Sequence, residues 1–379
     1  MKLIIAGGGT GGHLFPGIAV AEEFLARDSA NEVLFVGTER GVEARLLPKL
    51  GYRLELIAAA GVRGKSLIGQ IKGLAGLMYG YSQSRRILKD FKPDLVLGVG
   101  GYASAPIVLA ARGLLIPRFV HEQNAIPGMT NKFLSRLAGQ SFISLEESRK
   151  FFPKETTILT GNPLRKQILD EVANSPTVTT VSKGGSECSE QGGFHLLVFG
   201  GSLGAHSINM TLAAAAPLLA KMNRALTVTH QTGENDFAEV SAAYLAAGVK
   251  ATVLPFIENM AAEYRSADLI VCRAGATTLA EVTACGKPCI FIPFPHAVDD
   301  HQRKNAEALL KTGAGFMVLE RELTAESLVA QIAELLDSPD LLQETAAKAR
   351  EMGKLDAAKI IVDLMVKSLQ VDSEPGVEA

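Results

Sequence analysis

Short runs of apolar residues alternate along the chain with longer segments in which apolar residues recur every three or four positions. The short runs indicate buried strands, and the longer period indicates helices. In the first half, the pattern predicts strands at Leu3–Ala6, Val33–Val36, Leu95–Val99 and Arg118–His121 and helices at Phe15–Arg27, Val42–Leu50, Ser104–Ala111 and Met129–Leu137. This alternation predicts an α/β fold with a mostly parallel, doubly wound sheet.

The same alternation begins again in the second half of the chain. It predicts strands at His195–Phe199, Ala225–His230, Ala251–Leu254, Asp268–Cys272 and Pro288–Ile292, with helices near Leu203–Met222 and Thr277–Cys285. A chain of 379 residues is also too long for one ordinary core. We therefore expect two similar lobes.

Polar segments separate and end these lobes. Asn174–Gly193 contains almost no large apolar residue, so we expect a flexible linker or surface excursion. Asp372–Ala379 is similarly polar and is expected to fray. Between them, Ala357–Leu369 has a helical period and is able to pack on either lobe.

Charge is distributed unevenly along the chain. Residues 1–165 carry 21 Lys and Arg against 13 Asp and Glu, whereas residues 166–379 carry 17 against 27. A positive lobe is attracted to phospholipid, diphosphate or nucleic acid, and an acidic lobe is repelled by them. The alternative interpretation is ordinary scatter of surface charge.

Cysteine spacing and the apolar runs restrict the cellular environment. The four cysteines are Cys188, Cys272, Cys285 and Cys289, and they form no CxxC pair. Such sparse cysteines do not resemble a disulfide framework or a zinc site, so a reducing cytosol is expected. The apolar run after Met1 is too short for a signal peptide, and charges interrupt the other runs before they reach membrane-spanning length.

A glycine-rich loop, Gly7–Gly12, follows the first predicted strand and precedes a helix. Such a junction directs backbone N–H groups and the positive end of the helix dipole toward an anion. The loop also satisfies GxGxxG, which suggests a dinucleotide oxidoreductase, but Glu39 lies beyond the position expected for its ribose-binding residue. His13 stands where a P-loop requires Lys, which argues against an NTPase.

A second glycine-rich loop, Gly200–Ala205, follows the first strand of the second lobe. Each loop alone is compatible with a tight turn that binds nothing. Their equivalent positions predict two Rossmann-like domains that face each other across a cleft holding a ligand.

Seven segments together carry a family resemblance. They are GGGTGGHLFPGIAVAEE (7–23), GVGGYASAP (98–106), HEQNAIPGMTNK (121–132), GNPLR (161–165), FGGSLGA (199–205), CRAGATTLAE (272–281) and DDHQRKNA (299–306). They resemble the MurG family, which transfers N-acetylglucosamine (GlcNAc) from UDP-GlcNAc to the muramoyl sugar of undecaprenyl-diphospho-muramoyl-pentapeptide, lipid I. The product is lipid II for peptidoglycan synthesis.

The resemblance implies a GT-B architecture of two Rossmann-like domains. Residues 1–163 would bind the acceptor and the membrane, and residues 164–353 would bind UDP-GlcNAc. A final helix at about 354–371 would return to the first domain. The insert at 174–193 is longer and more polar than the family's usual connection. Asp299 and Asp300, where other members vary, also depart from the pattern.

Inverting transfer requires a base for the attacking C4 hydroxyl of the acceptor. The resemblance implies that His13 lies at the catalytic site, where an imidazole is a suitable proton acceptor. Glu122 is the alternative base. His13 could instead cap the helix or orient the acceptor's phosphate.

The resemblance also implies a donor site without a metal or other cofactor. Backbone groups near Gly204 and the helix starting near Ala276 would stabilise the diphosphate, Glu281 would bind the ribose and Ile257 the uracil. Gln302 and Asn305 would bind GlcNAc, while Arg165 and Arg273 would lie near the diphosphate or form interdomain ion pairs. The complete donor-binding set is Thr10, Gly11, Gly12, Asn124, Arg165, Ser202, Leu203, Gly204, Ile257, Arg273, Ala276, Thr277, Thr278, Glu281, Gln302 and Asn305.

The acceptor side is expected to include Tyr102, His121 and Gln123; Thr10 and Asn124 also lie in acceptor-side segments. Val62–Arg86 is an amphipathic basic segment, suited either to an anionic bilayer or to the core. The implied location is peripheral, on the cytoplasmic face of the inner membrane. The implied partners are both substrates and a cell-wall synthesis complex, with no nucleic acid.

Three alternatives remain at this stage: an NAD(P)-dependent oxidoreductase, a UDP-GlcNAc epimerase of the GT-B type and a binding protein without turnover. The displaced Glu39 counts against the first. The acceptor-side segments at 98–106 and 121–132 favour transfer over the other two.

Overall fold

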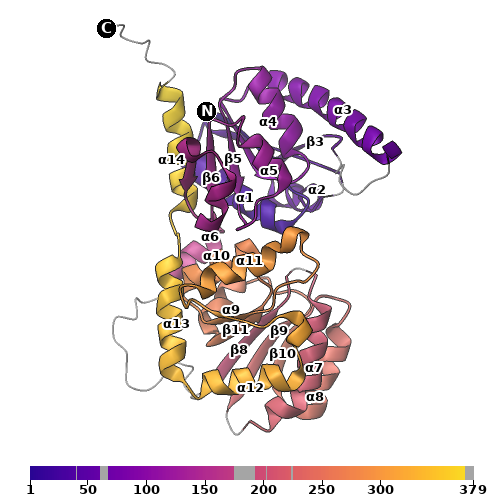
Figure 1. Ribbon diagram of the computed structural model, residues 1–379, viewed down its shortest axis with the longest axis vertical. Helices are drawn as coiled ribbons and strands as arrows, with labels where there is room; N and C mark the ends of the chain where they lie inside the picture. The colour runs from indigo at the N-terminus through magenta and orange to yellow at the C-terminus, as the bar shows by residue number, and fades with distance from the viewer. Residues whose placement is uncertain (40, 60–66, 175–192, 202, 223–224, 372–379) are drawn as a thin grey trace. The chain divides into compact units, whose positions relative to one another are not determined.

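The computed structural model describes residues 1–39, 41–59, 67–174, 193–201, 203–222 and 225–371. The chain divides into two compact units. Unit 1 comprises Met1–Lys166 and Lys354–Ala379, and unit 2 comprises Gln167–Gly353. Each unit contains one parallel sheet with helices packed against it (Figure 1).

Unit 1 contains the four predicted strands, here β1, β2, β4 and β5, and three strands that the apolar pattern did not predict, β3, β6 and β7. Its elements are β1 (Lys2–Gly7), α1 (Gly11–Ala26), β2 (Glu32–Gly37), α2 (Glu43–Leu46), β3 (Arg53–Leu56), α3 (Leu67–Phe91), β4 (Leu95–Gly100), α4 (Ser104–Gly113), β5 (Arg118–Glu122), α5 (Met129–Leu134), β6 (Gln140–Ile143), β7 (Thr157–Leu159) and α14 (Ala357–Val371). The strand order is β3-β2-β1-β4-β5-β6-β7.

Unit 2 repeats this arrangement. Its elements are α6 (Lys166–Asn174), which begins at the last residue of the first segment of unit 1, then β8 (Phe194–Phe199), α7 (His206–Ala220), β9 (Leu226–Gln231), α8 (Phe237–Ala247), β10 (Lys250–Leu254), α9 (Met260–Ser266), β11 (Leu269–Cys272), α10 (Ala276–Cys285), β12 (Cys289–Phe291), α11 (His301–Leu310), β13 (Phe316–Met317), α12 (Ala325–Leu336) and α13 (Pro339–Met352). The strand order is β10-β9-β8-β11-β12-β13.

Both strand orders are those of the Rossmann fold, in which the first strand lies at the point where the order reverses. The predicted fold class of two Rossmann-like α/β domains is therefore confirmed. At a reversal point, the loops that follow neighbouring strands diverge and leave room for a ligand. In unit 1 these are the loops after β1 and β4, and in unit 2 those after β8 and β11.

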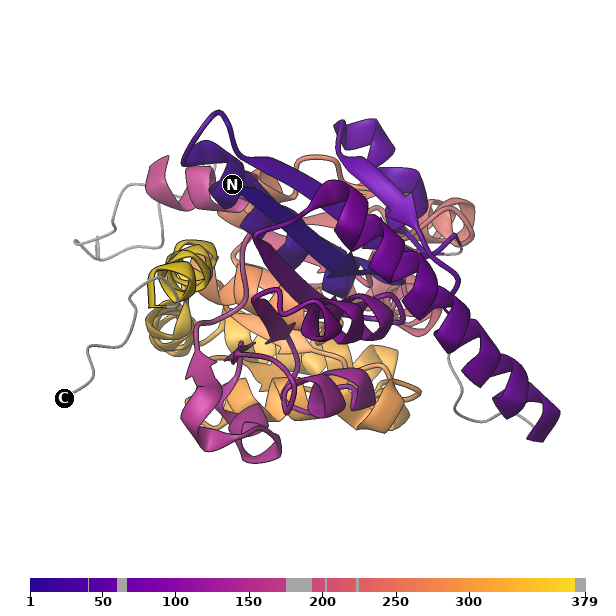
Figure 2. The same cartoon turned by 90° about the horizontal axis from the view of Figure 1, so that it is seen from above.

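The continuous apolar runs of the central strands reflect burial on both faces of each sheet. In β1, Leu3 and Ile5 pack on one face with α1 and α14, whereas Ile4 and Ala6 pack on the other with α3, α4 and α5. Seen from above, α3 and α14 lie on opposite sides of the sheet of unit 1 (Figure 2).

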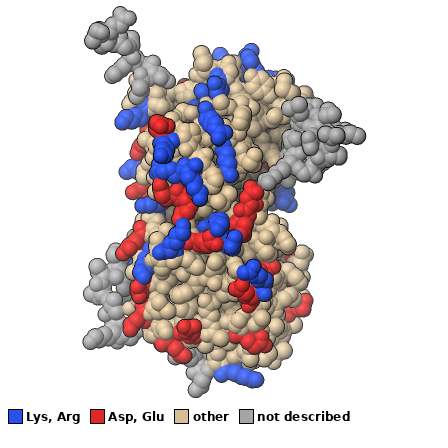
Figure 3. All heavy atoms as spheres, in the orientation of Figure 1, with Lys and Arg blue, Asp and Glu red and all other residues tan. Residues whose placement is uncertain are grey.

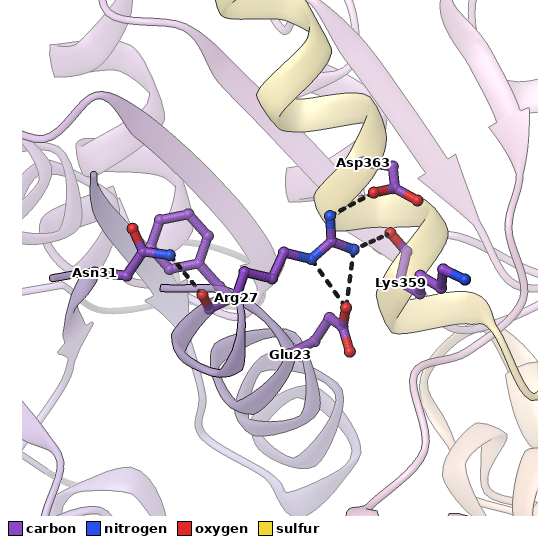
Figure 4. A network of polar contacts seen from close by, with 6 residues as sticks. Glu23, Arg27, Asn31, Lys359 and Asp363 are labelled. Carbon is purple, nitrogen blue, oxygen red and sulfur yellow. Dashed lines mark hydrogen bonds and ion pairs between the residues drawn. The ribbon is translucent and has the colours of Figure 1, made fainter. Parts of the chain in front are cut away.

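Helix α14 completes unit 1 although it follows all of unit 2 in sequence. Its Ile361, Val362 and Met365 are fully buried in the core beside α1. Arg27 at the end of α1 donates to the carboxylate of Asp363 and to the carbonyl of Lys359, and its ion pair with Glu23 orients the guanidinium (Figure 4). Apolar packing and the contacts of Arg27 thus join α1, near the start of the chain, to α14, near its end.

Several predicted helices have different limits in the structure. The helix expected at Phe15–Arg27 begins four residues earlier, at Gly11 in α1, so His13 lies inside the helix. The helix expected at Val42–Leu50 is interrupted at Pro48, which has no N–H to donate; α2 ends at Leu46 and a 3₁₀ turn follows. The helix expected at Met129–Leu137 ends at Leu134 in α5. The helix expected near Leu203–Met222 begins only at His206, after a tight turn at Gly204 with φ of +78°. The expected linker at 174–193 lies almost wholly outside the described residues.

Candidate active site

A buried carboxylate organises the glycine-rich loop after β1. Glu43 is 1% exposed; its Oε2 accepts from the backbone N–H of Gly9 at 2.7 Å, and its Oε1 accepts from the N–H and hydroxyl of Thr38 at 2.9 and 3.1 Å. A Cβ atom at Gly8, Gly37 or Gly41 would overlap the Glu43 side chain. The three glycines therefore leave the space that the Glu43 carboxylate occupies, and the carboxylate fixes the loop through the N–H of Gly9.

Two more glycines, at the end of β4, bring the imidazole of His13 against the sheet. Gly100 has φ of +98°, and a Cβ there would lie 2.8 Å from Nδ1 of His13. Gly101 has φ of +81°, and a Cβ there would meet the carbonyl of Gly8. The two glycine-rich segments of unit 1 thus pack directly on each other, and His13 is held beside them in the first turn of α1.

A chain of hydrogen bonds runs from His13 into the core of unit 1. Nδ1 of His13 lies 2.9 Å from Oε1 of Gln123, and Nε2 of Gln123 lies 3.0 Å from Nδ1 of His121. Gln123 and His121 are each 1% exposed, whereas His13 is half-buried. Burial lowers the pKa of His121 to about 4, so its imidazole is neutral at physiological pH.

Glu122 points into a different set of partners. Its Oε1 accepts from the N–H and side-chain amide of Asn124, and its Oε2 accepts from the N–H of Gly128 and the amide of Asn131. The side chain is 1% exposed. A carboxylate with both oxygens occupied inside a loop is suited to shaping that loop, so this geometry favours His13 over Glu122 as a proton acceptor.

The remaining predicted residues of unit 1 lie at its surface. Thr10 is exposed and precedes α1 in an extended conformation, and within the described structure its side chain makes no capping hydrogen bond. Tyr102 is 58% exposed, and Gly12 is exposed at the start of α1. Arg165 lies over the ring of Phe15, with 5.2 Å between its guanidinium carbon and the ring centroid. Gly11 is half-buried at the first position of α1.

In unit 2, Gln231 joins the glycine-rich loop after β8 to the segment after β10. Its Nε2 donates to the carbonyl of Gly201 at 2.7 Å, and its Oε1 accepts from the N–H of Ile257 at 2.8 Å. Gly204 packs so closely on the carbonyl of Thr232 that a Cβ would overlap it. Leu203 projects from the loop and is 87% exposed, and Ser202 lies outside the described residues.

The start of α10 offers polar groups to a ligand. Ala276, Thr277 and Thr278 form its first turn after Gly275. Oγ1 of Thr277 is buried and, in the part of the chain that the structure describes, has no hydrogen-bond partner. One turn later, Glu281 is 3% exposed and accepts from the hydroxyl of Tyr264 at 3.0 Å. An unused hydroxyl beside a helix N-terminus indicates a binding site for an oxyanion.

Two predicted sugar-binding residues lie on α11 but differ in exposure. Oε1 of half-buried Gln302 accepts from the N–H of Phe294 at 3.0 Å. Asn305 is fully buried, and its amide donates to the carbonyl of Ala274. Just before α11, Asp299 and Asp300 adopt left-handed φ angles of +52° and +54°, and Asp300 pairs with Arg303.

Arg273 ties together the ends of the strands in unit 2. Its Nη1 donates to the carbonyls of Ile292 and Pro293, its Nη2 donates to the hydroxyl of Ser207, and it pairs with Glu320. All these partners belong to unit 2. The observed ion pair of Arg273 is therefore not the interdomain bridge that the sequence left open.

Two groups of residues extend the predicted site, and neither carries a local motif. Glu43 lies next to Gly9 because β1 and β2 pair side by side in the sheet. Gln231 and Tyr264 support the donor-side residues Ile257 and Glu281 from neighbouring elements. The described residues contain no group of three or more His, Cys, Asp or Glu side chains able to hold a metal ion.

Comparisons with known proteins define the class of enzyme. Profiles of the glycosyltransferase family 28 N-terminal and C-terminal domains match residues 3–143 and 195–361. Together with the relatives described next, these matches show that the chain belongs to glycosyltransferase family 28 and, within it, to the MurG family.

Two relatives have the same curated name, UDP-N-acetylglucosamine–N-acetylmuramyl-(pentapeptide) pyrophosphoryl-undecaprenol N-acetylglucosamine transferase. That of Geotalea daltonii is 66% identical over 96% of this chain and 97% of its own length. That of Geobacter sulfurreducens is 64% identical over 97% of this chain and 99% of its own length.

Solved structures agree with this assignment. The crystal structure of Acinetobacter baumannii MurG is 34% identical, with a TM-score of 0.76 over 97% of this chain and 99% of that one. A UDP-GlcNAc 2-epimerase of Neisseria meningitidis is only 17% identical, with a TM-score of 0.67 over 97% and 100% of the two chains, and shows the fold alone.

Proposed function

We propose that this chain transfers GlcNAc from UDP-GlcNAc to the C4 hydroxyl of the muramoyl sugar of lipid I, with inversion at the anomeric carbon, to form lipid II. The observation that carries the reaction is the identity of 60–66% over nearly the full length to enzymes named as N-acetylglucosamine transferases acting on N-acetylmuramyl-(pentapeptide) pyrophosphoryl-undecaprenol. The chain is a UDP-GlcNAc-dependent glycosyltransferase. Epimerase activity is not favoured, since that similarity extends only to the fold.

The first turn of α10 and Glu281 support a donor site in unit 2. A diphosphate at the N-terminus of α10 would accept from its backbone N–H groups and from the unused hydroxyl of Thr277. The carboxylate of Glu281 would accept from the ribose hydroxyls, with Tyr264 fixing its orientation. These donors would stabilise the charge that develops on departing UDP.

The other proposed donor contacts are constrained by bonds already present. The N–H of Ile257 is occupied by Gln231, which fixes the peptide that would face the uracil. The buried amide of Asn305 shapes the segment after β11, and half-buried Gln302 is the more accessible side chain for a sugar hydroxyl. Arg273, already paired with Glu320, would act mainly by holding β11 and β12.

In unit 1, His13 is proposed as the general base. The acceptor hydroxyl would give its proton to Nε2 of His13 as its oxygen bonds to the anomeric carbon and the bond to UDP breaks. Thr10, Gly11 and Gly12 surround the exposed end of α1, where the sugars or their phosphates would bind. Tyr102 would contact the acceptor, and Asn124 would contact the donor from the loop that Glu122 shapes.

Peripheral attachment to the cytoplasmic face of the inner membrane is part of this proposal. No helix among the described residues is long and apolar enough to cross a membrane. On α3, Met78 and Tyr79 are 64% and 62% exposed, and the same helix contains Arg85, Arg86 and Lys89. Lys and Arg side chains, with Asp and Glu among them, also lie on the visible face of unit 1 (Figure 3). Apolar side chains beside positive charge are suited to an anionic bilayer. The proposed participation in a cell-wall synthesis complex rests on the family alone.

The test is a transfer assay with purified protein, radiolabelled UDP-GlcNAc and a lipid I analogue. A labelled disaccharide lipid together with an equal amount of free UDP is expected. Release of UDP and an epimerised sugar without the disaccharide lipid would support the epimerase instead. Binding of UDP-GlcNAc with no product would contradict both activities.

A further inference from the structure

The buried chain behind His13 has only one consistent arrangement of protons. Nε2 of Gln123 lies 2.9 Å from the carbonyl of Val99 and 3.4 Å from the carbonyl of His121. Carbonyl oxygens only accept, so this corner of the side-chain amide must be its NH₂ group. A flipped amide would bring its oxygen against both carbonyls. Oε1 is therefore the atom that lies 2.9 Å from Nδ1 of His13.

The same reasoning fixes both imidazoles. Since Oε1 of Gln123 only accepts, Nδ1 of His13 must carry a hydrogen and donate it. At the inner end, Nε2 of His121 lies 3.3 Å from both the carbonyl of Gly161 and the hydroxyl oxygen of Ser144. The carbonyl only accepts, and the Ser144 hydroxyl donates to Oδ1 of Asn162, so Nε2 of His121 carries the hydrogen. Nδ1 of His121 is then free to accept from the second amide hydrogen of Gln123 at 3.0 Å.

Burial keeps this arrangement in a single state. His121 and Gln123 are each 1% exposed, so water does not compete for their bonds. Burial also keeps His121 neutral, because it lowers the pKa of this imidazole to about 4. A protonated His121 would carry a hydrogen on Nδ1, which would oppose the amide hydrogen of Gln123. The neutral core thus holds the Gln123 amide in one orientation.

From this geometry we infer that Gln123 is a positioning residue that, backed by His121, fixes neutral His13 as the Nδ1–H tautomer. The lone pair of His13 then lies on Nε2, the nitrogen that the proposed function assigns to the attacking hydroxyl; the inference rests on that proposal only for its catalytic consequence. The bond from Nδ1 to Gln123 persists when Nε2 takes the proton. A neutral amide therefore selects the tautomer without a carboxylate.

The direct test is the protonation pattern of His13 in nitrogen-15 NMR. The protein contains seven histidines, and a His13→Asn variant identifies the His13 signals. In the parent, neutral His13 is expected to show Nδ1 of the protonated type and Nε2 of the lone-pair type. In Gln123→Leu the two nitrogens should move toward intermediate shifts, because no acceptor holds Nδ1–H.

Kinetics test the consequence. Gln123→Leu should lower kcat at least tenfold while the KM for UDP-GlcNAc changes little, since an imidazole in the wrong tautomer loses its function as a base. Gln123→Glu in its protonated form directs a carbonyl oxygen toward Nδ1–H of His13 and an O–H toward the carbonyl of Val99, so it should keep the parent's tautomer and recover part of kcat. Gln140→Leu makes the same change in β6, at an Oε1 without a partner among the described residues, and should change neither measurement.

Each outcome decides the inference. A parent His13 with its proton on Nε2, or unchanged His13 shifts in Gln123→Leu, would overturn it. A fall in kcat without a tautomer change would reduce Gln123 to a structural residue, and the inference would be wrong. If Gln123→Leu does not fold by thermal melting, the parent spectrum and Gln123→Glu still decide. A parent-like rate in His13→Asn would contradict the proposed base, whereas the NMR result would still judge the tautomer.

Discussion

The carboxylate of Glu43 accepts a 2.7 Å hydrogen bond from the backbone N–H of Gly9, 34 positions earlier in the chain. That N–H belongs to the GxGxxG match, so it is already used inside unit 1. The structure therefore gives a physical reason why this glycine-rich loop does not act as the pyrophosphate cradle of an NAD(P) enzyme.

Replacing Glu43 with Gln should destabilise unit 1 and reduce transfer. A Gln side chain has one acceptor oxygen, so its NH₂ group would face either Gly9 or Thr38, both of which donate. The expected cost is about 1–3 kcal/mol in the free energy of unfolding, measured by urea denaturation. Glu39→Gln, at an exposed carboxylate in the same segment, should stay within about 0.5 kcal/mol of the parent. Equal stability of the two variants would contradict the role of Glu43.

Changing Thr277 to Val should separate binding from stability. Its hydroxyl has no partner among the described residues, so its loss should leave the free energy of unfolding unchanged or slightly raised. UDP affinity should fall by about 0.5–1.5 kcal/mol, as for one lost hydrogen bond, in isothermal calorimetry. Unchanged UDP affinity would place the diphosphate elsewhere.

Glu281→Ala should have a larger effect on UDP binding. Loss of a charged acceptor should weaken affinity by about 1.5–3 kcal/mol, or roughly tenfold to a hundredfold. Tyr264→Phe keeps the carboxylate but removes the hydroxyl that orients it, so a smaller loss is expected in the same titration. If Tyr264→Phe weakened binding more than Glu281→Ala, the ribose contact would not belong to Glu281.

His13→Ala should reduce turnover and leave donor binding intact. His13 belongs to unit 1, whereas the proposed UDP-binding side chains of α10 belong to unit 2. Removal of a general base should lower kcat by roughly 10² to 10⁴ with little change in UDP affinity. Steady-state kinetics and calorimetry on the same preparation measure both quantities. A rate loss below tenfold would return attention to other proton acceptors.

The periodic pattern predicted the central strands of both sheets, which are continuously apolar because both of their faces are buried, but it did not predict β3, β6, β7 or β13. It failed at Val42–Leu50, where the apolar period continues across Pro48 but the backbone hydrogen bonding cannot. The end of the helix expected at Met129–Leu137 was harder to predict, because hydrogen-bonded turns continue beyond Leu134 after the helix itself has ended.

The motifs predicted which side chains gather but not which way each one points. In the HEQN segment, Gln123 contacts both His13 and His121, whereas the intervening Glu122 points into its own loop. This alternation follows from the extended backbone at the end of β5. Glu43 could not be recognised from the sequence as part of the site. Its partner Gly9 lies next to it only in the paired sheet, and three glycines leave the space for its side chain.

Buried neutral histidines should make the protein less stable as pH falls. Burial lowers the pKa of His121 to about 4 and of His230 to about 3. At pH values below the ordinary histidine pKa near 6.5, these histidines bind protons in the unfolded chain but not in the folded one. The free energy of unfolding is therefore highest above that pH and falls as the pH is lowered. Each histidine should account for about 2 kcal/mol of lost stability between pH 7 and pH 5.

A non-titrating variant isolates this contribution. His230 contacts Asn209 and Tyr244 in the core of unit 2, so His230→Gln should be less stable at pH 7 but should lose less stability on acidification. His296→Gln, at an exposed histidine of the same unit, should keep the parent's slope. Urea denaturation at several pH values measures both. Parallel slopes for His230→Gln and the parent would contradict the neutral state of His230.

Membrane attachment through α3 should depend on exposed side chains that the core does not need. Met78 and Tyr79 are 64% and 62% exposed, whereas Leu88 on the same helix is fully buried. Changing Met78 and Tyr79 to Ser should therefore release the protein from anionic vesicles without lowering its stability, because apolar contact with the bilayer is lost while the core is retained.

Sedimentation with phosphatidylglycerol vesicles measures binding, and added salt should weaken the parent's binding as it screens the basic residues. Activity on a short, water-soluble acceptor should stay near the parent level, whereas activity on vesicle-bound acceptor should fall. Equal sedimentation of variant and parent at low salt would exclude this surface as the attachment site.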